Sequence, residues 1–193
     1  MRIDRRLMVI TIVVAILASI PAAWWSTSGN GSVDDSGSDS IRLESPAGSI
    51  ALNRQSEGTL LATTGIESLT GDVVSTASLL GQPLIVNFWY STCEPCRREF
   101  PVLAAAHAAR GDTVRFVGVN INDSAAVTAD FAARYGAEFE QYRDPNGVLT
   151  AAMGIATAPV TLFVDAGGIV VRQVAGEITA AMLDATMRKA FGL

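Results

Sequence analysis

Apolar and polar positions along the chain change their pattern near residue 57. Beyond that point, apolar runs of strand length alternate with longer segments in which apolar residues recur at helical spacing. Leu84–Trp89 is a nearly continuous apolar run, which is typical of a strand that is covered on both faces. The order strand, helix, strand, helix between residues 84 and 135 predicts parallel strands joined by right-handed crossovers. Residues 57–193 are therefore expected to form an α/β domain.

Glycine, proline and capping residues indicate where the other elements begin and end. Turn residues at 70–72 and 166–168 predict hairpins over 65–74 and 160–174, and another strand is expected over 114–120. Gly111 and Gly136 each follow a helical pattern, as glycine does at helix ends. The predicted helices cover residues 93–109, 124–135, 148–153 and 179–191.

The N-terminal residues predict a membrane segment that lies outside this domain. Residues 1–6 contain three arginines, and Leu7–Trp25 contains no charged residue. As a helix, the uncharged stretch would span roughly 28 Å, close to the hydrocarbon thickness of a bilayer. No A-x-A cleavage pattern follows it, so an uncleaved anchor is favoured and a cleaved signal peptide is the alternative. The arginines place residues 1–6 in the cytoplasm and the rest of the chain outside it.

Residues 26–56 are predicted to form a flexible, acidic linker between the anchor and the domain. The first half of this stretch consists almost entirely of Ser, Gly, Asp, Asn and Thr. Such a composition cannot bury enough apolar area to offset the entropy of the chain. Residues 41–56 fit either more linker or a peripheral strand.

Charge and composition exclude several classes of function. The net charge is −5 and the basic residues form no cluster, which argues against a nucleic-acid partner. Cys93 and Cys96 are the only cysteines and His107 is the only histidine, so a scaffold of several disulfides or a histidine-rich metal site is excluded. His107 is too far along the predicted helix to act on Cys93, so it is expected to pack or to face solvent.

The two cysteines are the strongest candidates for chemistry. They stand at positions i and i+3 at the predicted start of a helix, a spacing that allows a disulfide. Because helix N-termini favour anions, Cys93 is the expected nucleophile, nearer to solvent and with a lowered pKa, and Cys96 is the expected resolving thiol. Two other interpretations stay open, a purely structural disulfide and half of a zinc site.

Two sequence motifs resemble a known family. Asn87–Pro101, NFWYSTCEPCRREFP, resembles the active-site segment of the TlpA-like and ResA-like membrane-anchored thiol-disulfide oxidoreductases of the thioredoxin superfamily. Thr157–Thr161, TAPVT, resembles a second motif of the same family, and the likeness extends from about residue 65 to residue 192. The resemblance implies a thioredoxin-like α/β fold, with a central mixed sheet flanked by helices, and a reaction that needs no cofactor.

The resemblance also implies roles for residues around the cysteines. Pro159 is expected to be in the cis form and to face the cysteine pair, and Ala158 to offer backbone hydrogen bonds to a substrate peptide. Trp89 and Thr92 are expected to belong to the substrate-binding surface, although many relatives have tryptophan where this chain has Thr92.

Glu99 is expected to be the acid–base group for Cys96, because the resembling family carries a glutamate at this position. Partial burial beside a sulfur atom would raise the pKa of Glu99 toward neutrality. The alternative is a surface glutamate that pairs with a nearby arginine.

These expectations imply thiol-disulfide exchange outside the cytoplasm. In the reducing direction, the partners would be exported proteins with disulfides. The resemblance implies that apocytochrome c is among them and that a membrane electron carrier of the CcdA/DsbD type restores the dithiol. The alternatives are a disulfide-forming oxidase, a thiol peroxidase, and a redox-silent peptide-binding domain in which Cys93 and Cys96 form a structural staple.

Overall fold

A computed structural model describes residues 52–193 of the chain. The predicted cytoplasmic N-terminus (1–6), the membrane anchor or signal peptide (7–25) and most of the predicted linker (26–56) lie outside the described residues. Among residues 52–193, none of the helices has the combination of length and apolar character that a bilayer-crossing helix needs.

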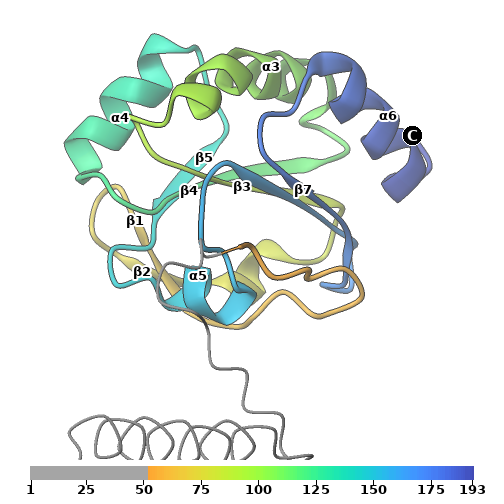
Figure 1. Ribbon diagram of the computed structural model, residues 1–193, viewed down its shortest axis with the longest axis horizontal. Coiled ribbons are helices and arrows are strands. Elements are labelled where there is room, and N and C mark those ends of the chain that lie inside the picture. The colour runs from red at the N-terminus through yellow and green to blue at the C-terminus, as the bar shows by residue number, and fades with distance from the viewer. Residues whose placement is uncertain (1–51) are drawn as a thin grey trace, which may run out of the picture. The chain divides into compact units, whose positions relative to one another are not determined.

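A seven-stranded sheet forms the centre of the described part of the chain (Figure 1). Its strands lie in the spatial order β2-β1-β5-β4-β3-β6-β7. Strands β3, β4 and β5 are mutually parallel, and the remaining pairs are antiparallel, so the sheet is mixed. The strands are β1 (Gly65–Ser68), β2 (Val73–Ser75), β3 (Leu84–Trp89), β4 (Arg115–Asn120), β5 (Glu140–Arg143), β6 (Val160–Val164) and β7 (Val170–Ala175).

The predicted parallel pair and both predicted hairpins are confirmed. Strand β3 pairs with β4 on one side and with β6 on the other, so it has no free edge. Every residue of β3 is buried, as its continuous apolar run predicts. Strand β5 and the 3-10 helix η1 (Thr76–Leu79) were not among the predicted elements.

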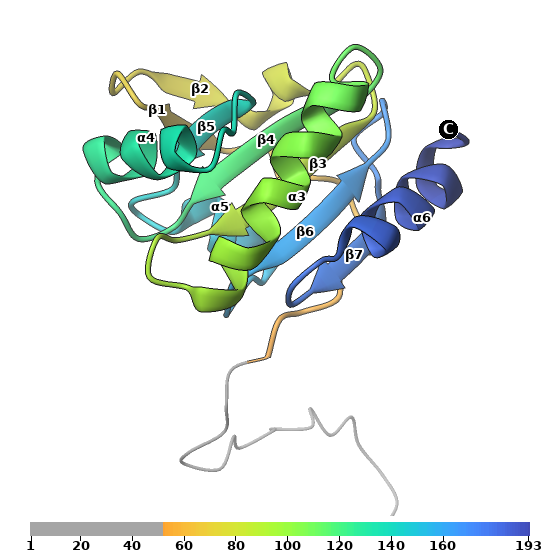
Figure 2. The ribbon, with the colours of Figure 1, turned by 90° about the horizontal axis from the view of Figure 1, so that it is seen from above.

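Helices cover both faces of the sheet. Helices α3 (Glu94–Arg110), α4 (Ala125–Arg134) and α6 (Ala180–Phe191) lie side by side on one face (Figure 2). The opposite face is covered by α5 (Val148–Met153), by η1 and by the segment that leads into β1. All four α-helices correspond to predicted ones, and each begins and ends within two residues of the expected position.

The alternation of side chains along β3 divides the hydrophobic core in two. Ile85 and Trp89 point toward α3, α4 and α6, whereas Val86 and Phe88 point toward α5 and η1. Asn87 belongs by this alternation to the first face, where a polar side chain must find a partner within the core. Asn87 finds that partner in the functional site described below.

The folded part of the chain begins earlier than residue 57. Arg54 donates its backbone N–H to the carbonyl of Gly154 at 2.8 Å, and the hydroxyl of Ser56 donates to the carbonyl of Met153 at 2.9 Å. The backbone N–H of Ser56 donates to Gln173 at 2.9 Å. Residues 53–56, which the sequence left open between linker and a peripheral strand, are thus held on the domain by hydrogen bonds to α5, Gly154 and β7.

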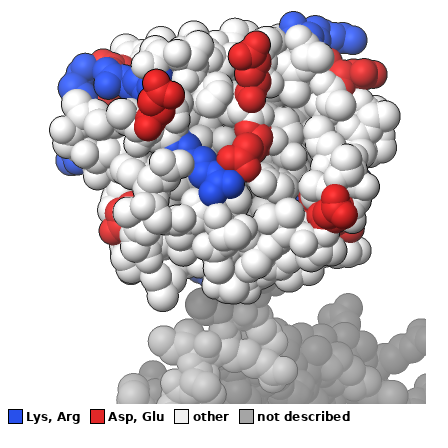
Figure 3. Space-filling model, turned by 180° about the vertical axis from the view of Figure 1, so that it is seen from behind, with Lys and Arg blue, Asp and Glu red and all other residues white. Residues whose placement is uncertain are grey.

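Charged side chains of both signs are mixed on the molecular surface. On the face that Figure 3 shows, Lys and Arg stand in small groups next to Asp and Glu, with wide uncharged areas between them. This face of the described residues has no continuous basic surface.

Candidate active site

The cysteine pair lies at the beginning of α3, directly after the buried strand β3. Cys93 and Cys96 form a disulfide with a Cα–Cα distance of 5.2 Å. Cys93 is the N-cap residue, and its sulfur accepts a hydrogen bond from the backbone N–H of Cys96 at 3.2 Å. Pro95 follows in the first turn, where a missing N–H costs no helical hydrogen bond. Backbone N–H groups and the helix dipole therefore favour negative charge on Cys93.

Cys93 is more exposed than Cys96, as expected, but the difference is small. Cys96 is completely buried, and Cys93 keeps 4% of its surface exposed. Cys93 is thus nearer to solvent than Cys96, but in this oxidised form its side chain packs into the core cluster around Trp89 and Phe100. A substrate has to reach Cys93 through a small opening.

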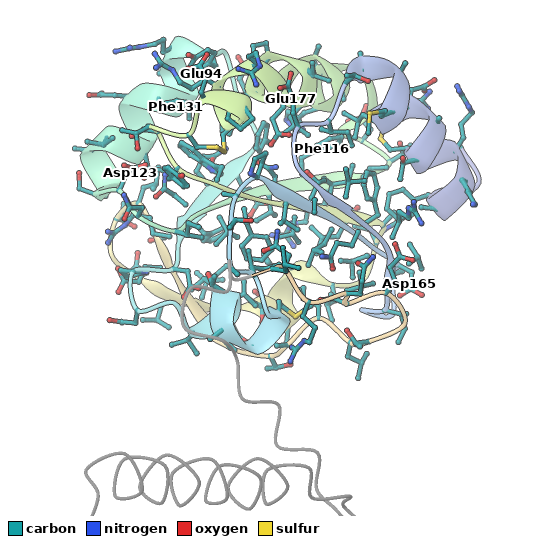
Figure 4. All side chains as sticks on the ribbon, in the orientation of Figure 1. Glu94, Phe116, Asp123, Phe131, Asp165 and Glu177 are labelled. Atoms are coloured by element: carbon teal, nitrogen blue, oxygen red, sulfur yellow. A yellow bond between two sulfur atoms is a disulfide. The ribbon has the colours of Figure 1, made fainter. Side chains whose placement is uncertain are left out.

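A carboxylate on the neighbouring loop holds the segment before Cys93 in place. Asp123 accepts hydrogen bonds from the backbone N–H of Ser91 at 2.7 Å and from the Ser91 hydroxyl at 2.8 Å. It also accepts one from the side-chain amide of Asn120, at the end of β4, at 2.7 Å. Figure 4 shows Asp123 on the α4 side of the disulfide and Glu177 on the other side. No motif in the sequence predicted this role of Asp123.

The second motif, residues 157–161, is brought to the cysteine end of the sheet by the pairing of β6 with β3. The Ala158–Pro159 peptide bond is cis, as the resemblance implied, and it precedes β6. Because β6 pairs with β3 and places Thr161 opposite Asn87, the loop before β6 lies at the end of the sheet where β3 leads into Cys93. Pro159 is buried and Ala158 is half-buried.

The loop before β6, which contains the cis proline and is called the proline loop below, is held by Asn53, a residue within the predicted linker (26–56). The side-chain oxygen of Asn53 accepts hydrogen bonds from the backbone N–H groups of Ala156 and Thr157, at 2.6 and 2.9 Å. Its amide nitrogen donates to the Thr157 hydroxyl at 3.1 Å. An asparagine in a polar stretch carries no signal for such a contact, so only the structure reveals it.

Glu99 is the buried acid of the site. It is completely buried, three residues after Cys96 on α3. One carboxylate oxygen accepts a hydrogen bond from the Asn87 amide at 2.8 Å, and the other accepts one from the backbone N–H of Ile178 at 2.9 Å. Burial raises the pKa of Glu99 to about 7, and the two hydrogen bonds oppose that rise. The alternative of a surface glutamate paired with arginine is therefore excluded.

Asn87 links this acid to the strand beyond it. Its amide nitrogen also donates to the Thr161 hydroxyl at 3.0 Å, while its buried oxygen has no hydrogen-bond partner among the described residues. Glu99, Asn87 and Thr161 thus form a buried polar cluster beneath the cysteine pair. The cluster can take up or release a proton near neutral pH.

An exposed ion-pair network surrounds the start of α3. Arg98 contacts Glu177 at 2.7 Å and Glu94 at 3.4 Å, and Arg97 contacts Glu94 at 3.7 Å. Each of these arginines is about half exposed, so screening by water leaves little stabilisation from the pairs. Their positive charges are largely matched by Glu94 and Glu177, and the helix terminus itself remains the main influence on Cys93.

Two residues expected on the substrate-binding surface have different environments. Thr92 is exposed beside Cys93. Trp89 is completely buried, packs against Phe100 and Phe131 with ring centroids 4.6 Å away in each case, and donates its indole N–H to Gln141. The expected contact of Trp89 with substrate is therefore wrong, because its position in β3 points the ring into the core.

His107 serves in packing, as expected. Its ring meets Phe116 and Phe139 at centroid distances of 5.6 and 5.8 Å, far along α3 from the cysteines. Among residues 52–193, His, Cys, Asp and Glu side chains form no group of three that fits a metal ion. The chemistry of the described site is that of two sulfurs and one carboxyl group.

Comparison with known proteins places this site in context. Residues 59–173 match the family described as AhpC/TSA. Over 129 residues, the chain is 30% identical to the thiol-disulfide oxidoreductase ResA of Bacillus subtilis, a match that covers 66% of this chain and 72% of the relative.

Solved structures share the fold. A secreted disulfide oxidoreductase of Mycobacterium tuberculosis, described as homologous to E. coli DsbE, is 27% identical with a TM-score of 0.59, covering 68% of this chain and 96% of that one. The thioredoxin domain of a Bacteroides vulgatus thiol-disulfide oxidoreductase is 23% identical with a TM-score of 0.61, covering 70% and 98%. The thioredoxin-like fold implied by the sequence motifs is confirmed.

Proposed function

We propose that this chain, which belongs to the AhpC/TSA family and is a thiol-disulfide oxidoreductase of the ResA type, reduces disulfides of exported proteins outside the cytoplasm. The observation that carries the proposal is the placement of Cys93 and Cys96 at the N-terminus of α3, above a buried acid. That placement supplies a stabilised thiolate, a second thiol within bonding distance and a proton acceptor, which are the three requirements of dithiol exchange.

The reaction begins with the dithiol form of the pair. The thiolate of Cys93 attacks one sulfur of a substrate disulfide, so that a mixed disulfide forms and the other substrate sulfur leaves as a thiolate. The thiolate of Cys96 then attacks the sulfur of Cys93, which closes the Cys93–Cys96 disulfide and releases the second substrate thiolate. Two electrons pass from the protein to the substrate, the proton of Cys96 goes to Glu99, and the two substrate thiolates take their protons from the solvent.

Glu99 supplies the proton transfer that the second step needs. Cys96 is completely buried, so its thiol has no access to water as a base. A carboxyl group with a pKa of about 7, one helical turn away on the same helix, can take that proton at neutral pH. The hydrogen bonds from Asn87 and Ile178 hold the charged carboxylate in place before the transfer, and Glu99 is neutral after it.

The direction and location of the reaction complete the proposal. The segment Leu7–Trp25 anchors the chain in the membrane, with the catalytic domain outside the cytoplasm. Exported proteins, apocytochrome c among them, are the substrates, and a membrane carrier of the CcdA/DsbD type returns the two electrons. The secreted relative from Mycobacterium tuberculosis supports an extracytoplasmic site of action.

Trapping of mixed disulfides tests the exchange mechanism. Cys96→Ser removes the thiol that resolves the intermediate, so covalent complexes through Cys93 should accumulate in cells and disappear on reduction. Cys93→Ser is the matched control and should trap far less, because Cys96 is buried. Equal trapping by both variants, or by neither, would contradict the assignment of Cys93 as nucleophile.

The reduction potential of the pair tests the direction. A reductase of exported proteins needs a potential below that of its substrates, and each 30 mV corresponds to about 1.4 kcal/mol. Equilibration of the full chain with glutathione or dithiothreitol buffers, followed by alkylation of free thiols, measures this value. A potential near that of the strongly oxidising disulfide-forming proteins, about −120 mV, would mean that the protein is an oxidase and not a reductase.

A further inference from the structure

A groove lies beside the cysteine pair, on the side that faces α4. It has a volume of about 390 Å³ and runs from Ser91 and Thr92 along one face of α4. Nothing in the exchange steps described above uses it. Because Thr92 directly precedes Cys93, the groove begins where a substrate bonded to Cys93 would lie.

The walls of the groove are held in a fixed arrangement. Ser91, at one end, is bound to Asp123 through two hydrogen bonds. Phe131, in the floor, packs against Trp89 and Tyr135 with ring centroids 4.6 Å away in both cases. Figure 4 shows Phe131 between α4 and the start of α3, close to the disulfide. A ligand would therefore meet a preformed surface, which lowers the entropic cost of binding.

Thr92 leaves this surface open. Its side chain is exposed, and its hydroxyl makes no hydrogen bond to any residue between 52 and 193. Because a threonine side chain is small, it takes up little room beside Cys93 and leaves the rim with a hydroxyl and space for a polypeptide.

Two charged residues on α4 lack partners within the groove. Arg134 and Asp130 are exposed, and neither makes a hydrogen bond or ion pair with another residue of the described part of the chain. Arg97 also lines the groove, but it is engaged with Tyr135 at 3.4 Å and with Glu94 at 3.7 Å. The free guanidinium of Arg134 presents parallel N–H groups that match a carboxylate.

We propose that this groove is a substrate subsite, in which an extended segment beside the reacting cysteine of the substrate lies over Thr92 and Phe131 and Arg134 binds an acidic side chain of that segment. The inference rests on the proposed function, since it names the chemistry of the polypeptide that this site accepts. Continuity with the site identifies the occupant, because the groove begins at Ser91 and Thr92, within reach of residues that flank a sulfur bonded to Cys93.

Asp130 makes the charge preference testable in both directions. It stands one helical turn before Arg134, on the same face of α4, so its carboxylate repels an acidic side chain that Arg134 attracts. Removing Arg134 should therefore weaken the preference for an acidic substrate, and removing Asp130 should strengthen it. A role of either residue in stability alone would not produce opposite changes.

Disulfide-containing peptides with defined flanks provide the probe. One glutamate is moved residue by residue along the segments that flank the disulfide, and a matching series carries glutamine. The reduced full chain should favour glutamate over glutamine at one or more positions by roughly two- to fivefold in kcat/KM, the range typical of exposed ion pairs. Arg134→Gln should remove this ratio, Asp130→Asn should increase it, and added salt should reduce it.

Control measurements separate this proposal from the proposed function. Arg188→Gln makes the same change of charge on α6, away from the groove, and should keep the wild-type ratio. If Arg134→Gln keeps the ratio at every position while the peptides are still reduced, the subsite is wrong and the exchange function stands. If the reduced chain acts on neither the peptides nor a small aromatic disulfide, the proposed function itself fails.

Discussion

At the scale of single residues, Glu99 concentrates the unusual physical chemistry of the site. A carboxyl group without solvent contact is expected to be neutral, yet each of its oxygens here accepts a hydrogen bond, one from Asn87 and one from Ile178. These donors favour the carboxylate and partly offset the cost of burial. The balance leaves the pKa at about 7, where both protonation states are populated under physiological conditions.

This balance predicts how the stability of the oxidised protein depends on pH. Below about pH 4.5 the Glu99 carboxyl is protonated in both the folded and the unfolded chain; between 4.5 and about 7 only the unfolded chain releases the proton. The free energy of unfolding should therefore fall as pH rises through this window, by about 3 kcal/mol in total. Denaturant titrations at several pH values, compared between wild type and Glu99→Gln, measure this contribution.

Glu99→Gln should remove that part of the pH dependence and still fold. The glutamine oxygen can accept from Ile178, and its amide can donate to the oxygen of Asn87, which has no other partner among the described residues. Asn87→Leu is the opposing variant: it removes a donor to the carboxylate, so the pKa of Glu99 rises further and the fall in stability extends to higher pH. Identical pH profiles for the three proteins would contradict the assignment.

Single residues also show what the sequence can and cannot predict. The cysteine pair, the cis proline and the buried glutamate were all expected, because two local motifs carry them. For Trp89, the apolar run of β3 predicted burial and the resemblance implied contact with substrate; the ring is buried, since side-chain direction depends on the pairing of β3 with β4 and β6. The low exposure of Cys93 likewise depends on distant residues that pack around it.

At the scale of elements, the start of α3 depends on the neighbouring β4–α4 loop. Asp123→Ala would leave the N–H and hydroxyl of Ser91 without their acceptor, at a cost of about 1–3 kcal/mol in the free energy of unfolding. Because Ser91 lies just before Thr92 and Cys93, the freed loop should also slow disulfide exchange. Stopped-flow reduction of a peptide disulfide and denaturant unfolding measure the two effects.

The hairpin between β6 and β7 offers a matched control for this prediction. Asp165 accepts hydrogen bonds from the backbone N–H groups of Gly167 and Ile169, so it holds a turn in a similar way but away from the cysteines (Figure 4). Asp165→Ala should lower stability to a similar degree and leave the exchange rate as it is. An equal slowing by both variants would mean that Asp123 acts through global stability alone.

The elements themselves were predictable in proportion to their apolar pattern. Strands β3, β4, β6 and β7 and all four α-helices carry clear periodicity or caps, and each was expected. Strand β5 has the sequence EQYR, whose polar residues give no strand signal. It forms because β4 and β1 pair with it on either side, and because Arg115 and Glu67 bind its charged side chains.

At the scale of the whole molecule, the sheet divides the catalytic domain into two halves, one on each of its faces, with different contents. The half under α3, α4 and α6 contains the disulfide, Glu99 and the groove, whereas the half under α5 has a mainly apolar core, in which Asp144 and Thr76 are buried with hydrogen-bond partners. Asn53 connects the halves, because this residue, near the end of the predicted linker (26–56), holds the loop that contains the cis proline. The first described residues of the chain are thus part of the fold and support the loop that contains the cis proline.

The position of the domain relative to the membrane can be tested with the two cysteines alone. Cys93 and Cys96 are the only thiols that the chain can form, so any labelling by a maleimide reports on this pair. If the domain lies outside the cytoplasm, a membrane-impermeant reductant followed by an impermeant maleimide should label the full chain in intact cells as strongly as after lysis under native conditions. A cytoplasmic protein with an accessible cysteine should remain unlabelled until lysis. Labelling that requires lysis would place the pair in the cytoplasm, where apocytochrome c and other exported disulfides do not reach it.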